Sequence, residues 1–313
     1  MANQLNHDDL IASIKRSISV PDNQARYSDA DFIAFANEEI QMTILPEILR
    51  LREDYLVYRE DITIVADQGS YQIPRRAVGR GLRDLYFFPD SSNTDKQNLP
   101  LISMQDDHLY TSVGDPTGYR LEGDKIVLMP TPDAAGGKLE VAFLLSPSQV
   151  TPITQSYQIT NINTVSGVIT VASTIDATLA STQIFDFVSN REASVPIKLS
   201  VDPTSFGGTT LTFAAADLPT ELAVGDYVTL EGDSPFISLP QEVHQVVSAA
   251  VACRVLEGIG DYEALKYADE RRNRAMRAMK EALAPRNIGE NKKIIDRNGL
   301  LKGRHQRNFR RLS

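Results

Sequence analysis

Residues 28–44, SDADFIAFANEEIQMTI, decide how the N-terminal region folds. One apolar side chain recurs at every fourth position: Phe32, Ala36, Ile40 and Ile44. This spacing predicts a helix with one buried face. Ser28, followed three residues later by the acid Asp31, predicts that the helix begins with a capping box. Pro46 lies inside the continuing apolar pattern, so we expect a kink or a break there.

Three further helices are expected, one before this segment and two near the C-terminus. The first would be capped by Asp8 or Asp9 and would end at Pro21. The second has Pro240 in its first turn and is separated from the third by a break at residues 258–260. Their candidate inward residues are Leu10, Ile11, Ile14 and Ile18 in the first, Val243, Val246, Val247, Ala250, Val251 and Val255 in the second, and Leu265, Ala268, Ala275, Met276, Met279 and Leu283 in the third.

Between these helices the period of the pattern changes from about four to two. Alternating polar and apolar residues, bounded by turn residues, predict strands at 61–64, 71–74, 82–88, 119–121, 125–129 and 139–145. Gly123 lies between two acidic residues in the short gap between two of these strands, which predicts a tight hairpin turn.

Residues 148–235 differ in composition from both flanking regions. They are rich in Thr, Ser, Val and Ile, poor in Lys and Arg, and contain Gly turns at short intervals. Two parts resemble each other: 167–171 with 186–188 downstream, and 208–213 with 226–228 downstream. We interpret this segment as a small all-β module, a barrel or a sandwich, and the similarity favours a duplicated strand unit.

The pattern as a whole predicts an α+β fold in four parts. Residues 1–147 form the N-terminal helices and a central antiparallel β region. Residues 148–235 form the inserted β module. Residues 236–284 return to helix and complete one bundle with the N-terminal helices. Residues 285–313 form an extended basic arm.

The arm differs from the rest of the chain in its charge. Residues 285–313 contain nine basic and two acidic residues, a net charge of +7, whereas the whole chain is −9, so residues 1–284 carry −16. Such an asymmetry points to a partner, although a solubilising tail is the alternative. With few apolar residues, the arm is expected to order only on docking.

The acidic body, residues 1–284, argues against general nucleic-acid binding, because it would repel phosphates.

No pattern in the chain predicts an enzyme, a metal site or a cofactor site. The one cysteine, Cys253, cannot form an internal disulfide, and its apolar neighbours favour a core position. Asp106, Asp107 and His108 are the one cluster that resembles metal ligands, and we interpret them as a solvated loop. No apolar run is long enough to span a membrane, and no secretory signal is recognisable, so synthesis in a cytoplasm is expected.

Several segments follow one another in an order that matches a known pattern: 9–11, 14–16, 20–21, 28–33, 37–40, 46–48, 52–55, 119–130, 239–240 and a helix ending near Cys253. Together they resemble the head-to-tail connector proteins, also called adaptor or neck proteins, of tailed bacteriophages. The resemblance covers residues 1–150 and 236–284. The inserted β module goes beyond the minimal pattern of this family.

The resemblance implies a structural protein of the virion that forms a ring, typically a dodecamer, below the portal of the capsid. The helices would pack side by side around a channel through which the genomic DNA passes without sequence-specific binding. The ring would also contact a downstream tail or nozzle protein. The arm would bind the portal through basic residues and two apolar anchors: Arg286, Lys292, Lys293, Arg297, Lys302, Arg304, Arg307, Phe309, Arg310, Arg311 and Leu312.

Two alternatives stay open at this point. A tail or baseplate component would use the β module for attachment and would expose aromatic residues on it; the candidates are Tyr157, Phe185, Phe187, Phe206, Phe213 and Tyr227. A cell-wall hydrolase would need two carboxylates facing each other across a cleft, with one raised pKa. The acid pairs available on helices are Asp29 with Asp31 and Glu38 with Glu39.

Overall fold

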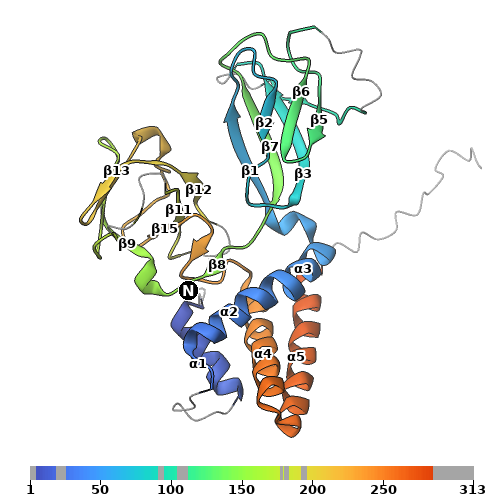
Figure 1. Ribbon diagram of the computed structural model, residues 1–313, viewed down its shortest axis with the longest axis vertical. Coiled ribbons are helices and arrows are strands. Elements are labelled where there is room, and N and C mark those ends of the chain that lie inside the picture. Colours follow the sequence, from blue (N-terminus) through green and yellow to red (C-terminus); the bar gives the residue numbers. More distant parts are fainter. Residues whose placement is uncertain are drawn as a thin grey trace, which may run out of the picture.

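The computed structural model describes residues 5–18, 26–90, 95–103, 112–176, 179, 183–191 and 196–284. These residues form a helical bundle, a β-sandwich and a β-barrel, each with its own apolar core (Figure 1). Both ends of the described chain belong to the bundle, and the two β lobes lie between them in sequence. The fold is therefore α+β, as the sequence predicts.

The bundle contains five α-helices among the described residues: α1 (His7–Ile18), α2 (Asp29–Glu39), α3 (Leu45–Leu51), α4 (Gln241–Ile259) and α5 (Tyr262–Leu283). A π-helical segment, η1 (Ile40–Ile44), joins α2 to α3, and a 3₁₀ segment, η2 (Glu53–Leu56), leads from α3 into the sandwich. The break expected near Pro46 thus takes the form of a wider helical turn directly before the proline. Proline lacks the N–H that an α-helix would need there, and a π-bulge is one way to accommodate its loss.

Both N-terminal helices begin with side-chain caps. Ser28 and Asp31 form the predicted capping box, in which the N–H of Ser28 donates to Oδ2 of Asp31 at 2.8 Å. The predicted cap of α1 was wrong. The side chain of Asn6, not Asp8 or Asp9, accepts a hydrogen bond from the N–H of Asp9 at 2.7 Å. The two aspartates lie in the first turn, where carboxylates interact favourably with the helix dipole.

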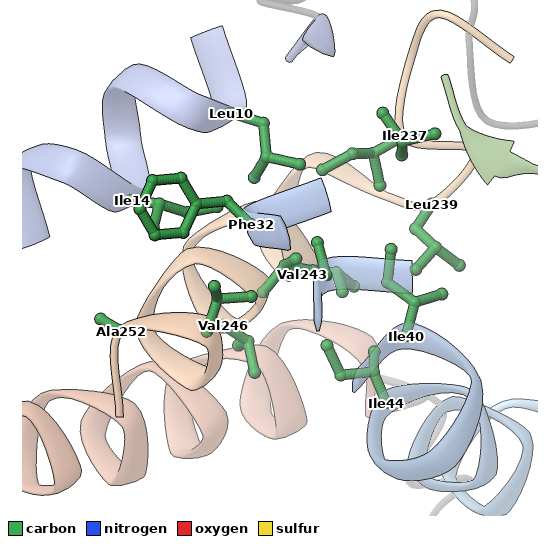
Figure 2. Packing of buried hydrophobic residues seen from close by; sticks show 14 of the residues in the cluster. Leu10, Ile14, Phe32, Ile40, Ile44, Ile237, Leu239, Val243, Val246 and Ala252 are labelled. Atoms are coloured by element: carbon green, nitrogen blue, oxygen red, sulfur yellow. The ribbon is translucent and has the colours of Figure 1, made fainter. Parts of the chain in front are cut away.

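α4 is the centre of the bundle, because its buried residues lie all round the helix. The predicted valine and alanine stripe is buried, but so are His244 and Cys253. α1, α2 and α5 all pack against α4 (Figure 1). Figure 2 shows Phe32 of α2 and Ile14 of α1 in one apolar core with Val243 and Val246 of α4. The sequence therefore predicts one buried stripe of α4 and a bundle with the N-terminal helices, but not the burial of α4 on all its sides.

Of the predicted break at residues 258–260, only Gly260 lies outside α4, which continues to Ile259. Gly260 terminates α4 with a left-handed φ of 85°, which glycine adopts without strain. Gly258 lies inside the helix, where a Cβ atom would lie 2.2 Å from the hydroxyl oxygen of Tyr27. A glycine is needed at position 258 because Tyr27 packs closely against the helix there, not because the chain turns.

The β-sandwich consists of two antiparallel sheets. One contains, in spatial order, β1 (Val57–Thr63), β7 (Lys138–Leu145), β3 (Ala77–Phe88) and β4 (Gln97–Asn98). The other contains β2 (Ser70–Gln72), β6 (Lys125–Met129) and β5 (Gly118–Glu122). Residues from both sheets share one core, and Gly123, at a φ of 63°, forms the predicted turn between β5 and β6. Each of the six predicted strands overlaps a strand of this lobe.

The inserted module is a seven-stranded sheet that curls into a nearly closed barrel. Its order is β12 (Lys198–Val201), β11 (Phe185–Val188), β15 (Tyr227–Leu230), β9 (Tyr157–Asn163), β10 (Val168–Val171), β14 (Thr210–Phe213) and β13 (Pro203–Gly207). The first and last strands of this order are separated in the chain by Asp202 alone, which brings the two edges together. Two short segments, η4 (Ile153–Gln155) and η5 (Ala215–Asp217), lie between strands. β8 (Gln149–Val150) and β16 (Asp233–Ser234) pair in parallel where the chain enters and leaves the barrel.

The strand pairing of the barrel supports a duplicated unit. β10 and β14, which carry the similar segments, pair antiparallel with Ile169 opposite Leu211. β11 and β15, which follow them in the chain, also pair with each other antiparallel. Equivalent strands pair in this way when an approximate two-fold axis relates two units. The units are β9–β10–β11 and β12/β13–β14–β15.

The two units provide a matched test of backbone crowding at Gly167 and Gly208, whose φ angles of 72° and 59° are both left-handed. A Cβ on Gly167 would lie 2.0 Å from the carbonyl oxygen of Phe213, whereas a Cβ on Gly208 would meet no atom within 4 Å. We predict that Gly208→Ala lowers the free energy of unfolding by about 1–2 kcal/mol. Gly167→Ala should cost clearly more, because backbone must also move. Urea unfolding measures both, and equal losses would contradict the packing described here.

Candidate functional site

The predicted partner-binding residues of the arm, from Arg286 to Leu312, lie outside the described residues. Asp106, Asp107 and His108 lie outside them as well. The structure does define where the arm starts. α5 ends beside α3, where Nζ of Lys280 lies 3.1 Å from Oε2 of Glu47. The chain therefore leaves α5 at the end of the bundle where α3 leads into the sandwich (Figure 1).

A buried ion pair joins the sandwich to the barrel. Arg76 lies in the turn between β2 and β3, and its Nη1 is 2.7 Å from Oδ2 of Asp186 on β11. The two side chains are 9% and 0% exposed. Nη2 of Arg76 also donates to the carbonyl oxygen of Ser146 at 2.8 Å and to Oγ of Ser148 at 2.9 Å. One guanidinium group thus contacts the barrel and the segment that leads into it.

Asp186 is held by the barrel as well as by Arg76. Its carboxylate accepts the N–H of Ser200 at 2.8 Å and the N–H of Gly232 at 2.9 Å. Burial raises the pKa of Asp186, while the charge of Arg76 and the two backbone N–H groups counteract this rise. A buried carboxylate needs such partners to stay charged. The site is therefore a fixed structural junction.

The ion pair between Arg76 and Asp186 is not predicted from the sequence, although the sequence contains a clue to Asp186. In the sequence, Asp186 is the first residue of a short segment, 186–188, that resembles the segment starting at Asp226. Asp226 is also buried, 1% exposed, and accepts the N–H of Ala223 at 2.8 Å and of Asn190 at 2.9 Å. The clue to a buried acid is that both similar segments begin with an aspartate followed by apolar residues. Nothing comparable in the sequence marks Arg76.

A pocket of about 220 Å³ opens beside the junction, between the sandwich and the barrel. Its polar lining includes Glu60, Arg75, Arg76, Ser200 and Glu231. Burial raises the pKa of Glu60, and the nearby charge of Glu231 adds to the rise. The pocket is smaller than most small-molecule sites, which begin at roughly 300 Å³. Its charged lining consists of two glutamates and two arginines, so the formal charges balance.

The acid pairs considered for a hydrolase have structural partners. Asp31 belongs to the capping box of α2. Oδ1 of Asp29 lies 2.7 Å from Nζ of Lys15, and Glu38 pairs with Arg254. Oε2 of Glu39 accepts a hydrogen bond from the hydroxyl of Thr43 at 3.0 Å. Helix capping, surface ion pairs and this local hydrogen bond thus give each of the four acids a structural partner.

The aromatic residues considered for attachment through the barrel are also structural. Five of the six are buried: Tyr157, Phe185, Phe187, Phe213 and Tyr227. The sixth, Phe206, is half-buried and packs against the barrel core. The exposed aromatic surface that this alternative requires is absent from these residues.

Cys253 occupies the core position that the sequence indicates. It is 5% exposed on α4, and burial raises the pKa of its thiol. Within the described ranges, no three His, Cys, Asp or Glu side chains are arranged to hold a metal ion. None of the described helices combines the length and the apolar character that a membrane span requires.

A comparison with protein families finds a match for the N-terminal half of the chain. The family model described as SU10 adaptor protein matches residues 5–169, which is more than half of the chain. The matched region contains the N-terminal helices, the sandwich and the start of the barrel. It agrees with the N-terminal part of the resemblance, whereas residues 236–284 lie beyond it. A search of curated proteins found no match.

The junction makes a prediction about two adjacent arginines. Arg76→Ala leaves the buried carboxylate of Asp186 without its cation, which typically costs about 3–5 kcal/mol. Arg75 is the matched control, because its side chain is 67% exposed and lies 3.9 Å from Glu231. Arg75→Ala should cost less than about 1 kcal/mol. Thermal and urea unfolding measure both changes. Similar losses in the two variants would show that the buried pair does not anchor the lobes.

Asp233 of β16 makes a prediction about pH. Burial raises its pKa to about 6, with a further contribution from Asp186, while Arg76 opposes the rise. A raised pKa in the folded state means that the charged form destabilises the fold, so stability falls as the pH rises from 3.8 to about 6. Asp233→Asn should therefore raise the Tm at neutral pH and lose this advantage in acid. A difference that stays constant across this range would exclude the charge of Asp233 as the cause.

Proposed function

Because the chain belongs to the SU10 adaptor protein family, a family of phage head-tail adaptors, we propose that it joins the capsid of a tailed phage to its tail. In this proposal, copies of the chain form a dodecameric ring below the portal and surround the DNA channel. The role is structural and involves no catalysis. The protein is made in the host cytoplasm and resides at the capsid–tail junction of the virion.

The observation that carries the proposal is the family match over residues 5–169. The shape of the bundle is consistent with it. α4 and α5, with 19 and 22 residues, are the longest helices, and they pack against each other along their length (Figure 1). A bundle of this kind can serve as one segment of a ring wall, with helices side by side.

The charge distribution fits a protein that DNA must pass without binding. Residues 1–284 carry a net charge of −16, since the arm carries +7 and the whole chain −9. An acidic wall repels phosphates, so DNA would slide along it instead of adhering. The basic arm would serve the opposite purpose and hold an acidic groove of the portal.

In this proposal the arm binds the portal, and other surfaces of the ring bind the tail. The arm starts at the end of α5, which packs beside α3, where Lys280 pairs with Glu47. Its arginine and lysine residues can form charge-assisted hydrogen bonds with carboxylates, and Phe309 and Leu312 can anchor it in apolar pockets. The ring would then bind a downstream tail or nozzle protein through other surfaces.

Deletion of residues 286–313 tests the role of the arm. We predict that the shortened chain no longer co-purifies with the portal protein of the same phage, because the portal contacts are lost. Its Tm and circular dichroism should match those of the complete sequence. As a control, an arm with the same composition in scrambled order separates net charge from specific contacts. Undiminished portal binding by the shortened chain would contradict the proposed role.

A further inference from the structure

One side of the bundle is acidic. The segment 29–44, which forms α2 and η1, contains four acidic residues and no basic residue: Asp29, Asp31, Glu38 and Glu39. Two of them have a cationic partner in the described chain, Asp29 with Lys15 and Glu38 with Arg254. The other two accept hydrogen bonds from hydroxyl and backbone groups. At 3.6 residues per turn, Asp31, Glu38 and Glu39 lie within about 100° of one another around the helix, whereas Asp29 lies on the opposite side. We call these three residues the acidic face, and it keeps a net negative charge because only Glu38 has a cationic partner among the described residues.

Another side of the bundle is basic. Residues 271–280 of α5 contain five basic residues and no acidic residue: Arg271, Arg272, Arg274, Arg277 and Lys280. Arg272 pairs with Asp269 at 2.6 Å, and Lys280 pairs with Glu47 at 3.1 Å. The remaining three are exposed and form no ion pair within the part of the chain that the structure describes. We call these three arginines the basic face.

Among the described residues, the arginines of the basic face form no ion pair with the acids of their own helix. Glu270 and Glu281 flank the arginine run in the sequence. Arg274 reaches only the main-chain carbonyl oxygen of Glu270, which its Nε approaches to 3.4 Å. The three guanidinium groups therefore remain available to carboxylates on another molecule, which they can bind with two parallel hydrogen bonds.

The two faces lie on different helices around α4 and at the same level along it. α2 and α5 both pack against α4 (Figure 1). Cys253 lies on α4, and the pKa of its thiol is affected by nearby charges on both helices: Arg272 and Asp269 on α5, and Glu39 on α2. The next residue of α4, Arg254, pairs with Glu38 of the acidic face. The end of α2 is therefore level with the start of the basic run.

We infer that the acidic face of one copy docks on the basic face of the next copy in the ring. The inference rests on the proposed function and adds the surfaces that build the ring. Since the faces share a level, a rotation about an axis along the bundle brings opposite charges together without a shift. A contact between two different faces of identical copies repeats around a ring, whereas acid against acid would repel. Met42, 78% exposed on η1, adds apolar area beside the acids.

Charge reversal on each face tests this contact. One variant carries Glu38→Lys and Glu39→Lys, and the other carries Arg271→Glu and Arg274→Glu. The mass of each is measured by sedimentation and native mass spectrometry, alone and with the portal protein of the same phage. Each variant by itself should lose the ring that the unmodified chain forms. An equal mixture should restore it, because the two variants can alternate with every contact oppositely charged.

A matched control reverses two exposed basic residues of the sandwich, Arg83→Glu and Lys125→Glu, and should leave the ring intact. Circular dichroism and the Tm establish that every variant is folded. Two outcomes would overturn the inference while the ring itself stands: rings from each variant alone, or folded variants whose mixture fails to assemble. If the unmodified chain forms no ring even with the portal, the proposed function fails instead.

Discussion

The structure depends on the burial of α4. A helix with apolar side chains on all sides has to be enclosed by other helices, since one exposed face would leave apolar surface in water. α1 and α2 come from the start of the chain, and α5 comes from the end. The enclosure of α4 therefore brings the two ends of the described chain together. Most of the chain between residues 52 and 240 leaves the bundle as two β lobes, while Leu56, Val150, Ile237 and Leu239 stay in the bundle core.

The barrel is inserted in the chain between the last strand of the sandwich, β7, and helix α4. The parallel contact between β8 and β16 places its entrance and exit side by side, so the barrel adds to the chain without disturbing the bundle. The ion pair between Arg76 and Asp186 then fixes the barrel against the sandwich. Buried ion pairs contribute little net stability compared with apolar packing, but they are costly to break. This pair therefore serves to fix one arrangement of the lobes.

Sequence reasoning predicted most of the elements, because local periodicity decides them. The capping box at Ser28 and the hairpin turn at Gly123 follow from short-range patterns. The similarity of segments 167–171 and 208–213 is a longer-range pattern, and the pairing of β10 with β14 is consistent with it. It placed the cap of α1 on the wrong residue, because Asn6 and the two aspartates offer similar acceptors within four positions. It could not predict contacts between distant residues. Arg76 and Asp186 are 110 positions apart, and the level shared by α2 and α5 depends on how helices pack around α4.

If the chain is a head-tail adaptor as proposed, it assembles into a ring on a phage portal. The most direct test is the mass of purified residues 1–313 in solution, measured by light scattering alone and after mixing with the portal protein of the same phage. The account predicts a complex whose added mass corresponds to a closed ring of chains of 34.6 kDa each. A chain that remains monomeric and does not bind the portal at any concentration would contradict it.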